Sequence, residues 1–454
     1  MSSISKSPRA DRSVSPRALQ PILAGLRKAN RANARLYPGE SHARQPVHTL
    51  YGGAHLFKSD TIVKLGSAAR LALEAYAPDA SALARTLGFD PELAAIVRAR
   101  VKDKLAVEPV EDFRIDFEDG YGIRTDAEED AHARSAALEV AAAHTAGLLT
   151  PFIGIRIKAL SPEMHARGLR TLDLFVTTLA RASRSLPQNF AVTIPKIATP
   201  AHVTAVVRMC AAIEHRLKLP RCSIALELMI ETPQSILGPD GSSPLRSLVA
   251  AGGGRVRGAH FGAYDYTALC GITASWQRMS HPACDFVRHM MQVALAQSGV
   301  WLSDGATNIM PIPPHRPVRG AALSEAERRE NHEVVRRAWK LHFDDTQHSL
   351  VSGFYQGWDL HPAQLPSRFA AVYAFFLGAR PAATVRLRNF IEKAAQATLL
   401  GDVFDDAATG QGLLNFFVRG LNCGALSIEE AEETGLTREE LQGRSFMKIV
   451  EARR

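Results

Sequence analysis

Acidic side chains close two short apolar segments of this chain. Glu231 ends the run "SIALELMIE" (223–231), and Asp265 ends the next run, "GAHFGAYD" (258–265). Two carboxylates that converge without a cationic partner repel each other, and a hard divalent cation relieves that repulsion. Oxygen ligands without a nearby Cys or His pair favour Mg²⁺ or Mn²⁺ over zinc. We therefore predict a metal site at Glu231 and Asp265, although Glu231 could instead cap a helix and Asp265 could hold a loop.

Other charged residues close further apolar runs. Arg156 in "GIRIK" could bind a substrate carboxylate through two parallel hydrogen bonds. It could also only form a salt bridge with Glu118 or Asp119, which lie in "FRIDFEDGYG" (113–122). Lys196 in "IPKI" allows a rival mechanism, because a desolvated lysine can form a Schiff base with a carbonyl substrate. Metal-binding carboxylates nearby would keep this lysine protonated, so we expect an electrostatic or structural role for it.

Three histidines are candidates for the general base by residue type. His48 and His55 lie in the segment "VHTLYGGAHLF", and His361 lies in "DLHPAQ". A lone histidine in a strand is more often a hydrogen-bonded core residue than a catalyst, so both interpretations of each histidine stay open.

Eight short β-rich runs, separated by helical segments, must position these residues. The runs span residues 47–52, 112–118, 152–159, 190–197, 223–231, 258–265, 300–306 and 352–359. This alternation predicts an α/β fold with a parallel sheet, and eight strands close into a (β/α)₈ TIM barrel. Polar residues gather at the C-terminal ends of the runs, where barrel active sites are assembled. An open doubly wound sheet is the alternative, but the sequence shows no glycine-rich nucleotide motif to anchor a ligand there.

Helices are expected to extend this barrel at both ends. One is predicted over residues 18–35, a second over 323–343, and the chain is purely helical after residue 367. Helical spacing over 284–295 predicts one buried stripe that includes Phe286. We therefore divide the chain into a basic N-terminal tail and helix (1–45), a catalytic TIM barrel (46–367) and a helical C-terminal extension (368–454).

Composition excludes several classes of protein. The net charge of +8 arises largely in the first 39 residues, where Asp11 is the sole acid. No aromatic residue is interleaved with the basic ones before Tyr37, so we expect a solvated tail and no nucleic-acid partner, although transit peptides share this composition. The sequence contains no uninterrupted apolar run of about 18 residues, so it predicts no membrane span. Five scattered cysteines without a CxxC spacing are typical of a reducing, cytoplasmic location.

Taken in order, the motifs resemble the HpcH/HpaI aldolase and citrate lyase family. They are "IDFEDGYG", "IRIK", "IPKI", "IETPQSI", "FGAYDYTALCGI" and "DLHPAQL", and the resemblance spans roughly residues 47 to 366. The resemblance implies that Glu231 and Asp265 bind Mg²⁺ and that Arg156 holds an oxo acid and stabilises its enolate. It also implies that Glu118 and Asp119 orient water or the ligand.

The implied activity is that of a metal-dependent carbon–carbon lyase of the aldolase type, acting next to a 2-oxo acid. We add His48 and Lys196 to Arg156, Glu118 and Asp119 as catalytic candidates. Besides Arg156, the residues expected to contact the substrate are Gly262, Ala263 and His361. The alternative is an acyl-CoA-dependent lyase or Claisen-condensing enzyme, although "VHTLYGGAHLF" lacks the Tyr/Phe-x-Pro-Ala segment that citrate-lyase-like members use near CoA. A third possibility is a barrel that binds an oxo acid or nucleic acid without catalysis. Members of the family are commonly oligomeric, so a homo-oligomer is expected.

Overall fold

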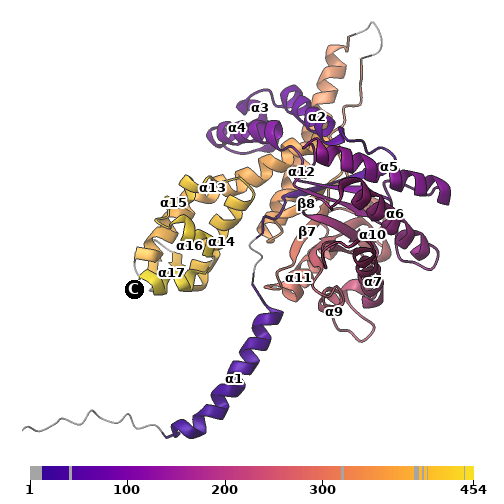
Figure 1. Cartoon of the computed structure of the whole chain (residues 1–454). Coiled ribbons are helices and arrows are strands. Elements are labelled where there is room, and N and C mark those ends of the chain that lie inside the picture. Colours follow the sequence, from indigo (N-terminus) through magenta and orange to yellow (C-terminus); the bar gives the residue numbers. More distant parts are fainter. Residues whose placement is uncertain are drawn as a thin grey trace, which may run out of the picture.

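A closed barrel of eight parallel strands forms the centre of the molecule (Figure 1). The computed structural model describes residues 13–39, 43–317, 322–392, 398–400, 403–405, 407–443 and 445–453. Strands β1 to β8 pair in chain order, and β8 pairs with β1. They span His48–Gly53, Asp112–Asp116, Phe152–Arg156, Phe190–Ile194, Ala225–Ile230, Val256–Phe261, Trp301–Ala306 and Gln356–Asp359. The predicted TIM barrel is confirmed.

Helices surround the barrel because each crossover between parallel strands must cover an apolar sheet face. They are α2 (Thr61–Tyr76), α3 (Ala80–Leu87), α4 (Pro91–Val107), α5 (Asp126–Thr145), α6 (His165–Ser183), α7 (Pro200–Leu217), α8 (Pro233–Ile236), α9 (Leu245–Ala251), α10 (Ala263–Leu269), α11 (Pro282–Leu295) and α12 (Glu325–Val351). A capping box of Ser324 and Glu327 opens α12, and the helix continues past its predicted end at residue 343 to Val351. No described helix is both long and apolar enough to cross a membrane.

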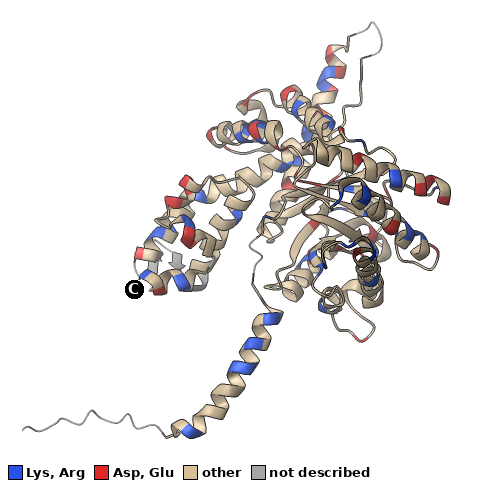
Figure 2. Cartoon of the chain, viewed as in Figure 1, with Lys and Arg blue, Asp and Glu red and all other residues tan. Residues whose placement is uncertain are grey.

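Helix α1 (Pro16–Leu36) stands away from the barrel and buries none of its residues (Figure 1). Its charged residues are all basic, as the blue segments in Figure 2 show. The side chain of its N-cap, Ser15, accepts a hydrogen bond from the Ala18 N–H at 3.3 Å, which explains where the helix begins.

The C-terminal helices form a cluster beside the barrel (Figure 1). They are α13 (Leu365–Glu392), α14 (Ala407–Asn422), α15 (Ile428–Glu432), α16 (Arg438–Gly443) and α17 (Phe446–Arg453). Aromatic contacts join them, with ring centroids 5.2 Å apart for Phe376 and Phe416 and 5.0 Å apart for Phe390 and Phe446. The expectation of a purely helical extension was wrong, because β9 (Thr398–Leu400) and β10 (Val403–Asp405) form a short antiparallel pair.

The buried stripe of α11 differs from the predicted one. Val287, Met291 and Leu295 are buried as expected, but half of the Phe286 surface is exposed. At 3.6 residues per turn Phe286 lies to one side of the stripe, and Arg288 takes the inward position. Its guanidinium tolerates burial because Nε donates to Asp304 Oδ2 at 2.8 Å.

Charged side chains fill the middle of the barrel. Arg114 on β2 reaches across to Glu227 on β5, with Nη2 at 2.5 Å and Nε at 3.1 Å from Glu227 Oε2. Its other terminal nitrogen donates to Asp112, and Arg257 Nε donates to Glu227 Oε1 at 3.1 Å. Burial raises the pKa of Glu227, but Arg114 and Arg257 together hold it well below its usual value. The core of the barrel therefore depends on the pairing of Arg114 and Arg257 with these two carboxylates.

Replacing Arg114 by Met should lower the free energy of unfolding by about 3–5 kcal/mol, because it leaves Asp112 and Glu227 buried without their partner. Urea unfolding followed by circular dichroism measures this change. The matched control is Lys64→Met on α2, whose exposed pair with Asp60 should contribute less than about 0.5 kcal/mol. Equal, small effects of the two substitutions would contradict a structural role for the ionic core.

Candidate active site

Asp116 and Arg156 lie side by side at the C-terminal end of the barrel, because β2 and β3 pair these two residues in register. Arg156 Nε donates to Asp116 Oδ1 at 2.7 Å and Nη2 donates to Oδ2 at 2.6 Å. Both side chains are buried. Burial lowers the pKa of Arg156, but Asp116 raises it well above its ordinary value, so the guanidinium stays charged.

The remaining nitrogen of Arg156 faces the acidic segment that follows β2. Nη1 lies 3.2 Å from Glu118 Oε2 and 3.6 Å from Asp119 Oδ2. It has no hydrogen-bond partner of suitable geometry in the described part of the chain. The aromatic rings of Tyr51 and Trp358 lie 5.0 and 5.3 Å from the guanidinium carbon. Arg156 thus forms the predicted ion pair and still has one donor available to a ligand.

Lys196 lies between the acidic side chains at the mouth. Its backbone has a φ of 49°, and in this left-handed conformation its N–H donates to Glu231 Oε1 at 2.6 Å. Its ammonium lies 2.6 Å from Glu118 Oε1, 3.2 Å from Asp119 Oδ2 and 3.4 Å from Asp265 Oδ2. Burial lowers the pKa of Lys196, but Glu231, Glu118 and Asp119 together raise it further than burial lowers it. A protonated amine cannot attack a carbonyl, which favours the electrostatic role over a Schiff base.

Glu231 and Asp265 come from neighbouring parts of the barrel. Glu231 follows β5 and is buried, whereas Asp265 lies in the first turn of α10. The expectation that Asp265 ends a strand was wrong, because β6 ends at Phe261 and the chain turns into a helix after Gly262. Burial and the charge of Asp265 raise the pKa of Glu231 to about 8.

This pair fits a hard divalent cation by its chemistry. Within the described ranges, no three His, Cys, Asp or Glu side chains are arranged to hold a metal ion. Mg²⁺ often takes one or two carboxylates from the protein and its other ligands from water and substrate, so two carboxylates suffice. A cation beside Glu231 would favour its ionised form and so offset the effects of burial and of Asp265, which raise its pKa.

The pKa values of Glu118 and Asp119 shift in opposite directions although the two residues are adjacent. Burial raises the pKa of Glu118 to about 7. Asp119 is more exposed, and Glu118, Arg156 and Lys196 together lower its pKa despite partial burial. At neutral pH Glu118 is therefore the member of the pair that can exchange a proton.

The other predicted residues are more dispersed. Gly262 lies against Glu231, and an added Cβ there would come within 2.3 Å of Glu231 Oε2. Ala263 next to it is buried at the start of α10. His361 follows β8 and caps a short 3₁₀ helix, Pro362–Gln364, by accepting the Ala363 N–H at 3.2 Å. Burial lowers the pKa of His361.

The structure does not bring His48 to these residues. Its ring packs behind the barrel wall, 5.4 Å from the ring of Phe369, and its Nε2 accepts the Glu111 N–H at 3.1 Å. The neighbouring residue Thr49 faces the interior instead and donates to Asp112. Because side chains alternate along a strand, His48 must point outward from the barrel.

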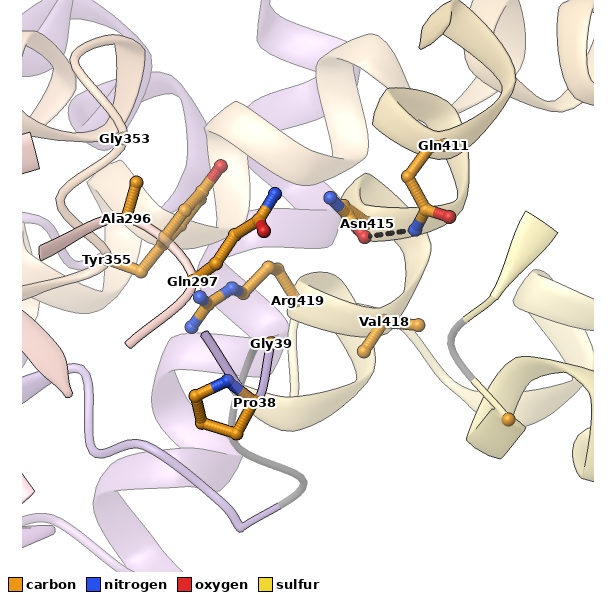
Figure 3. Close-up of a pocket in the computed structure, with 11 residues that line it drawn as sticks. Pro38, Gly39, Ala296, Gln297, Gly353, Tyr355, Gln411, Asn415, Val418 and Arg419 are labelled. Carbon is orange, nitrogen blue, oxygen red and sulfur yellow. Dashed lines mark hydrogen bonds between the residues drawn. The ribbon is translucent and has the colours of Figure 1, made fainter. Parts of the chain in front are cut away.

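A pocket of about 630 Å³ lies at the opposite end of the barrel (Figure 3). Pro38, Gln297 and Tyr355 in its lining precede strands β1, β7 and β8, whereas the carboxylates follow their strands. Arg419 of α14 completes this side of the pocket. We place the candidate site at the mouth and not in this pocket, because the charged residues converge at the mouth.

The family of the chain follows from comparison with known proteins. The model of a domain of unknown function, DUF6986, matches residues 26–449. The chain belongs to the DUF6986 family. No curated protein matches the sequence. The resemblance to the HpcH/HpaI aldolase and citrate lyase family therefore stays a prediction for this DUF6986 chain.

Comparison with solved structures supports the fold of this DUF6986 member through one of three similar proteins. A citrate lyase from Burkholderia xenovorans has a TM-score of 0.56 and 18% identity, over 87% of this chain and 97% of that chain. The protein CitE from Mycobacterium tuberculosis, in complex with magnesium, acetoacetate and coenzyme A, has a TM-score of 0.45 and 16% identity, over 84% and 99%. A Haloferax volcanii malate synthase has a TM-score of 0.45 and 15% identity, over 90% and 99%. CitE and the malate synthase superpose more weakly than the citrate lyase, and of these three structures only the citrate lyase supports a shared fold.

Sequence reasoning missed two residues of this site. It placed Asp116 by alternation on the same side as Glu118, as an acid that supports the metal site indirectly, and the structure pairs Asp116 with Arg156. It did not single out Tyr51 or Trp358, whose rings lie 4.3 Å apart beside Arg156. Trp358 could have been found from the sequence, because it lies on the last predicted strand, three residues before the candidate residue His361.

Substituting Gly262 by Ala should disturb Glu231 directly. The new methyl group would lie within 2.3 Å of Glu231 Oε2, so the carboxylate must move, and we expect a loss of about 1–3 kcal/mol in the free energy of unfolding. Gly412→Ala in α14 is the control, since no atom lies within 4 Å of its added Cβ and alanine favours a helix. If urea unfolding shows that Gly262→Ala is as harmless as the control, the described packing of Glu231 against Gly262 is incorrect.

Proposed function

We propose that this DUF6986 chain catalyses the cleavage or formation of a carbon–carbon bond next to a 2-oxo acid, with Mg²⁺ or Mn²⁺ and through an enolate. The observation that carries the proposal is the convergence at the barrel mouth of Glu231, Asp265 and Arg156, whose Nη1 makes no hydrogen bond to a described residue. The similarity in fold to a citrate lyase supports it.

Glu231 and Asp265 are the residues that would hold the cation. When bound, the cation would supply a Lewis acid that polarises the carbonyl oxygen and stabilises negative charge as it develops on the enolate. The deep burial of Glu231 and its contact with Gly262 fix one of the two carboxylates in place. The backbone N–H of Lys196 fixes the orientation of that carboxylate further.

Arg156 would bind the carboxylate of the 2-oxo acid. Asp116 occupies Nε and Nη2, so the guanidinium cannot rotate freely, and Nη1 donates in a fixed direction. A donor whose position is fixed before the substrate binds loses little conformational entropy on binding. The ammonium of Lys196 adds positive charge beside Glu118 and Asp119 and keeps these acids from repelling an anionic substrate.

Glu118 would transfer the proton. In the cleavage direction, its ionised carboxylate accepts the proton of the substrate hydroxyl while the carbon–carbon bond breaks, and the bonding electron pair passes into the enolate. The proton then returns to the enolate carbon, which restores Glu118 and yields the 2-oxo acid and a carbonyl product. A pKa of about 7 lets the same group accept and return a proton near neutral pH.

The metal site can be tested by substitution of its two proposed ligands. Glu231→Gln and Asp265→Asn should each weaken Mn²⁺ binding by about 100-fold or more, because each removes a charged ligand. Isothermal titration calorimetry measures the affinity.

A screen of pyruvate and oxaloacetate with varied aldehydes, and with acetyl-CoA, should show activity that both substitutions abolish. Glu163→Gln, in an exposed position after β3, is the matched control. Wild-type metal affinity in both ligand variants would refute the proposed site.

The proton-transfer role predicts a dependence of kcat/KM on pH. Because Glu118 accepts a proton only when ionised, kcat/KM should rise about tenfold per pH unit below its pKa of about 7 and level off above it. Glu118→Gln should remove this rise and lower the plateau by about 100-fold or more. The profile of Glu163→Gln should match the wild-type profile. A rise that persists in Glu118→Gln would assign the titration to another group.

A further inference from the structure

Several buried side-chain polar atoms have no hydrogen-bond partner among the described residues. Two of them, Arg156 Nη1 and the indole Nε1 of Trp358, belong to side chains that lie in contact at the barrel mouth. A buried donor without a partner costs free energy, and native proteins seldom leave one unless water or a ligand satisfies it. That two such donors lie in the same layer of the barrel indicates a shared ligand.

Trp358 lies on the interior face of β8. Gln356, two residues earlier on the same strand, donates to Thr49 Oγ1 inside the barrel at 2.9 Å, and alternation gives Trp358 the same face. The centroid of its ring lies 4.3 Å from that of Tyr51, with the two ring planes tilted by 40°, and the ring lies 5.3 Å from the guanidinium carbon of Arg156. The three side chains form one cluster, with two flat aromatic rings beside a guanidinium.

A carboxylate of the protein already lies against this cluster. Glu118 Oε2 lies 3.2 Å from Arg156 Nη1, yet no hydrogen bond forms between them. Glu118 belongs to the turn after β2, and its other oxygen binds the ammonium of Lys196 at 2.6 Å. A better aligned carboxylate from a small ligand could therefore replace it while Glu118 keeps its contact with Lys196.

We propose that Arg156 Nη1 and Trp358 Nε1 together bind the carboxylate of the substrate, one donor to each oxygen, against the ring of Tyr51. The identity of the ligand as a 2-oxo acid rests on the proposed function, whereas the donor pair itself rests on its geometry. Two donors held beside flat rings select a small planar carboxylate. A neutral amide of the same shape lacks the charge that Arg156 requires, so pyruvate binds and pyruvamide does not.

The indole N–H signals of the four tryptophans, Trp276, Trp301, Trp339 and Trp358, report the contact directly in ¹H–¹⁵N NMR spectra. Pyruvate added in EDTA, without divalent metal, should shift the signal of Trp358 and leave that of the exposed Trp276 unchanged. Pyruvamide should shift neither. The signal is assigned by its loss in Trp358→Phe or, should that variant not fold, by elimination with Phe at each of the other three positions. A Trp358 signal that pyruvate does not move overturns the proposal.

Affinity provides the second measurement. Trp358→Phe keeps an aromatic ring but removes the N–H, and it should weaken pyruvate binding about tenfold, or ~1.4 kcal/mol. Trp276→Phe is the control and should bind as the wild type does. Equal affinity of Trp358→Phe and the wild type overturns the proposal.

The outcome is separable from the proposed function, because Glu231→Gln should keep the pyruvate-induced shift in EDTA while it loses metal-dependent activity. If that shift occurs and no lyase activity is found, the proposed function fails and the donor pair stands. If lyase activity is found, but pyruvate does not shift the Trp358 signal and Trp358→Phe binds pyruvate as the wild type does, the donor pair fails and the proposed function stands.

Discussion

The carboxylate of Asp116 organises the mouth of the barrel. Its two oxygens accept Nε and Nη2 of Arg156 at 2.7 and 2.6 Å and the backbone N–H groups of Glu118 and Gly120 at 3.0 and 2.7 Å. The same residue thus fixes the arginine and shapes the acidic turn that faces it. Gly120 must be a glycine for this turn, since an added Cβ would lie 2.7 Å from Asp116 Oδ2. Charge-assisted hydrogen bonds of this kind are strong when they are buried and fully paired.

The mouth rests on a second ionic layer deeper in the barrel. Asp112, Arg114 and Asp116 alternate along β2 and share its interior face, so negative, positive and negative charges follow one another toward the mouth. Arg114 joins β2 to β5 through Glu227, and Glu231 lies at the end of that same strand. Buried ion pairs contribute little net stability but strongly disfavour any arrangement that separates them. The pairing therefore holds the relative positions of β2 and β5, and with them those of Arg156 and Glu231.

The sequence was sufficient for the eight strands, because apolar runs that end in charged residues are typical of parallel barrels. It was not sufficient for which side chains face inward. Parallel strands are buried on both faces, so His48 and Thr49 look equally like core residues although only Thr49 lines the interior. Asp265 shows a different limit, since "GAYDY" suits a strand or a short helix equally well. Its place in α10 still brings its carboxylate within 3.4 Å of Lys196.

A second arrangement in the molecule shows why residue types alone do not identify a site. Ser367 Oγ lies 2.8 Å from His342 Nδ1, and His342 Nε2 lies 2.9 Å from Asp359 Oδ1, which is the order of groups in a nucleophilic triad. All three side chains are buried, and Arg368 also binds Asp359, so no substrate can reach the serine. These residues join α12, α13 and β8 and hold the backbone just before His361. Arg156 and Trp358 differ because each has a buried donor without a hydrogen-bond partner among the described residues. Two such donors on side chains in contact at the barrel mouth are therefore the stronger indication of where a ligand binds.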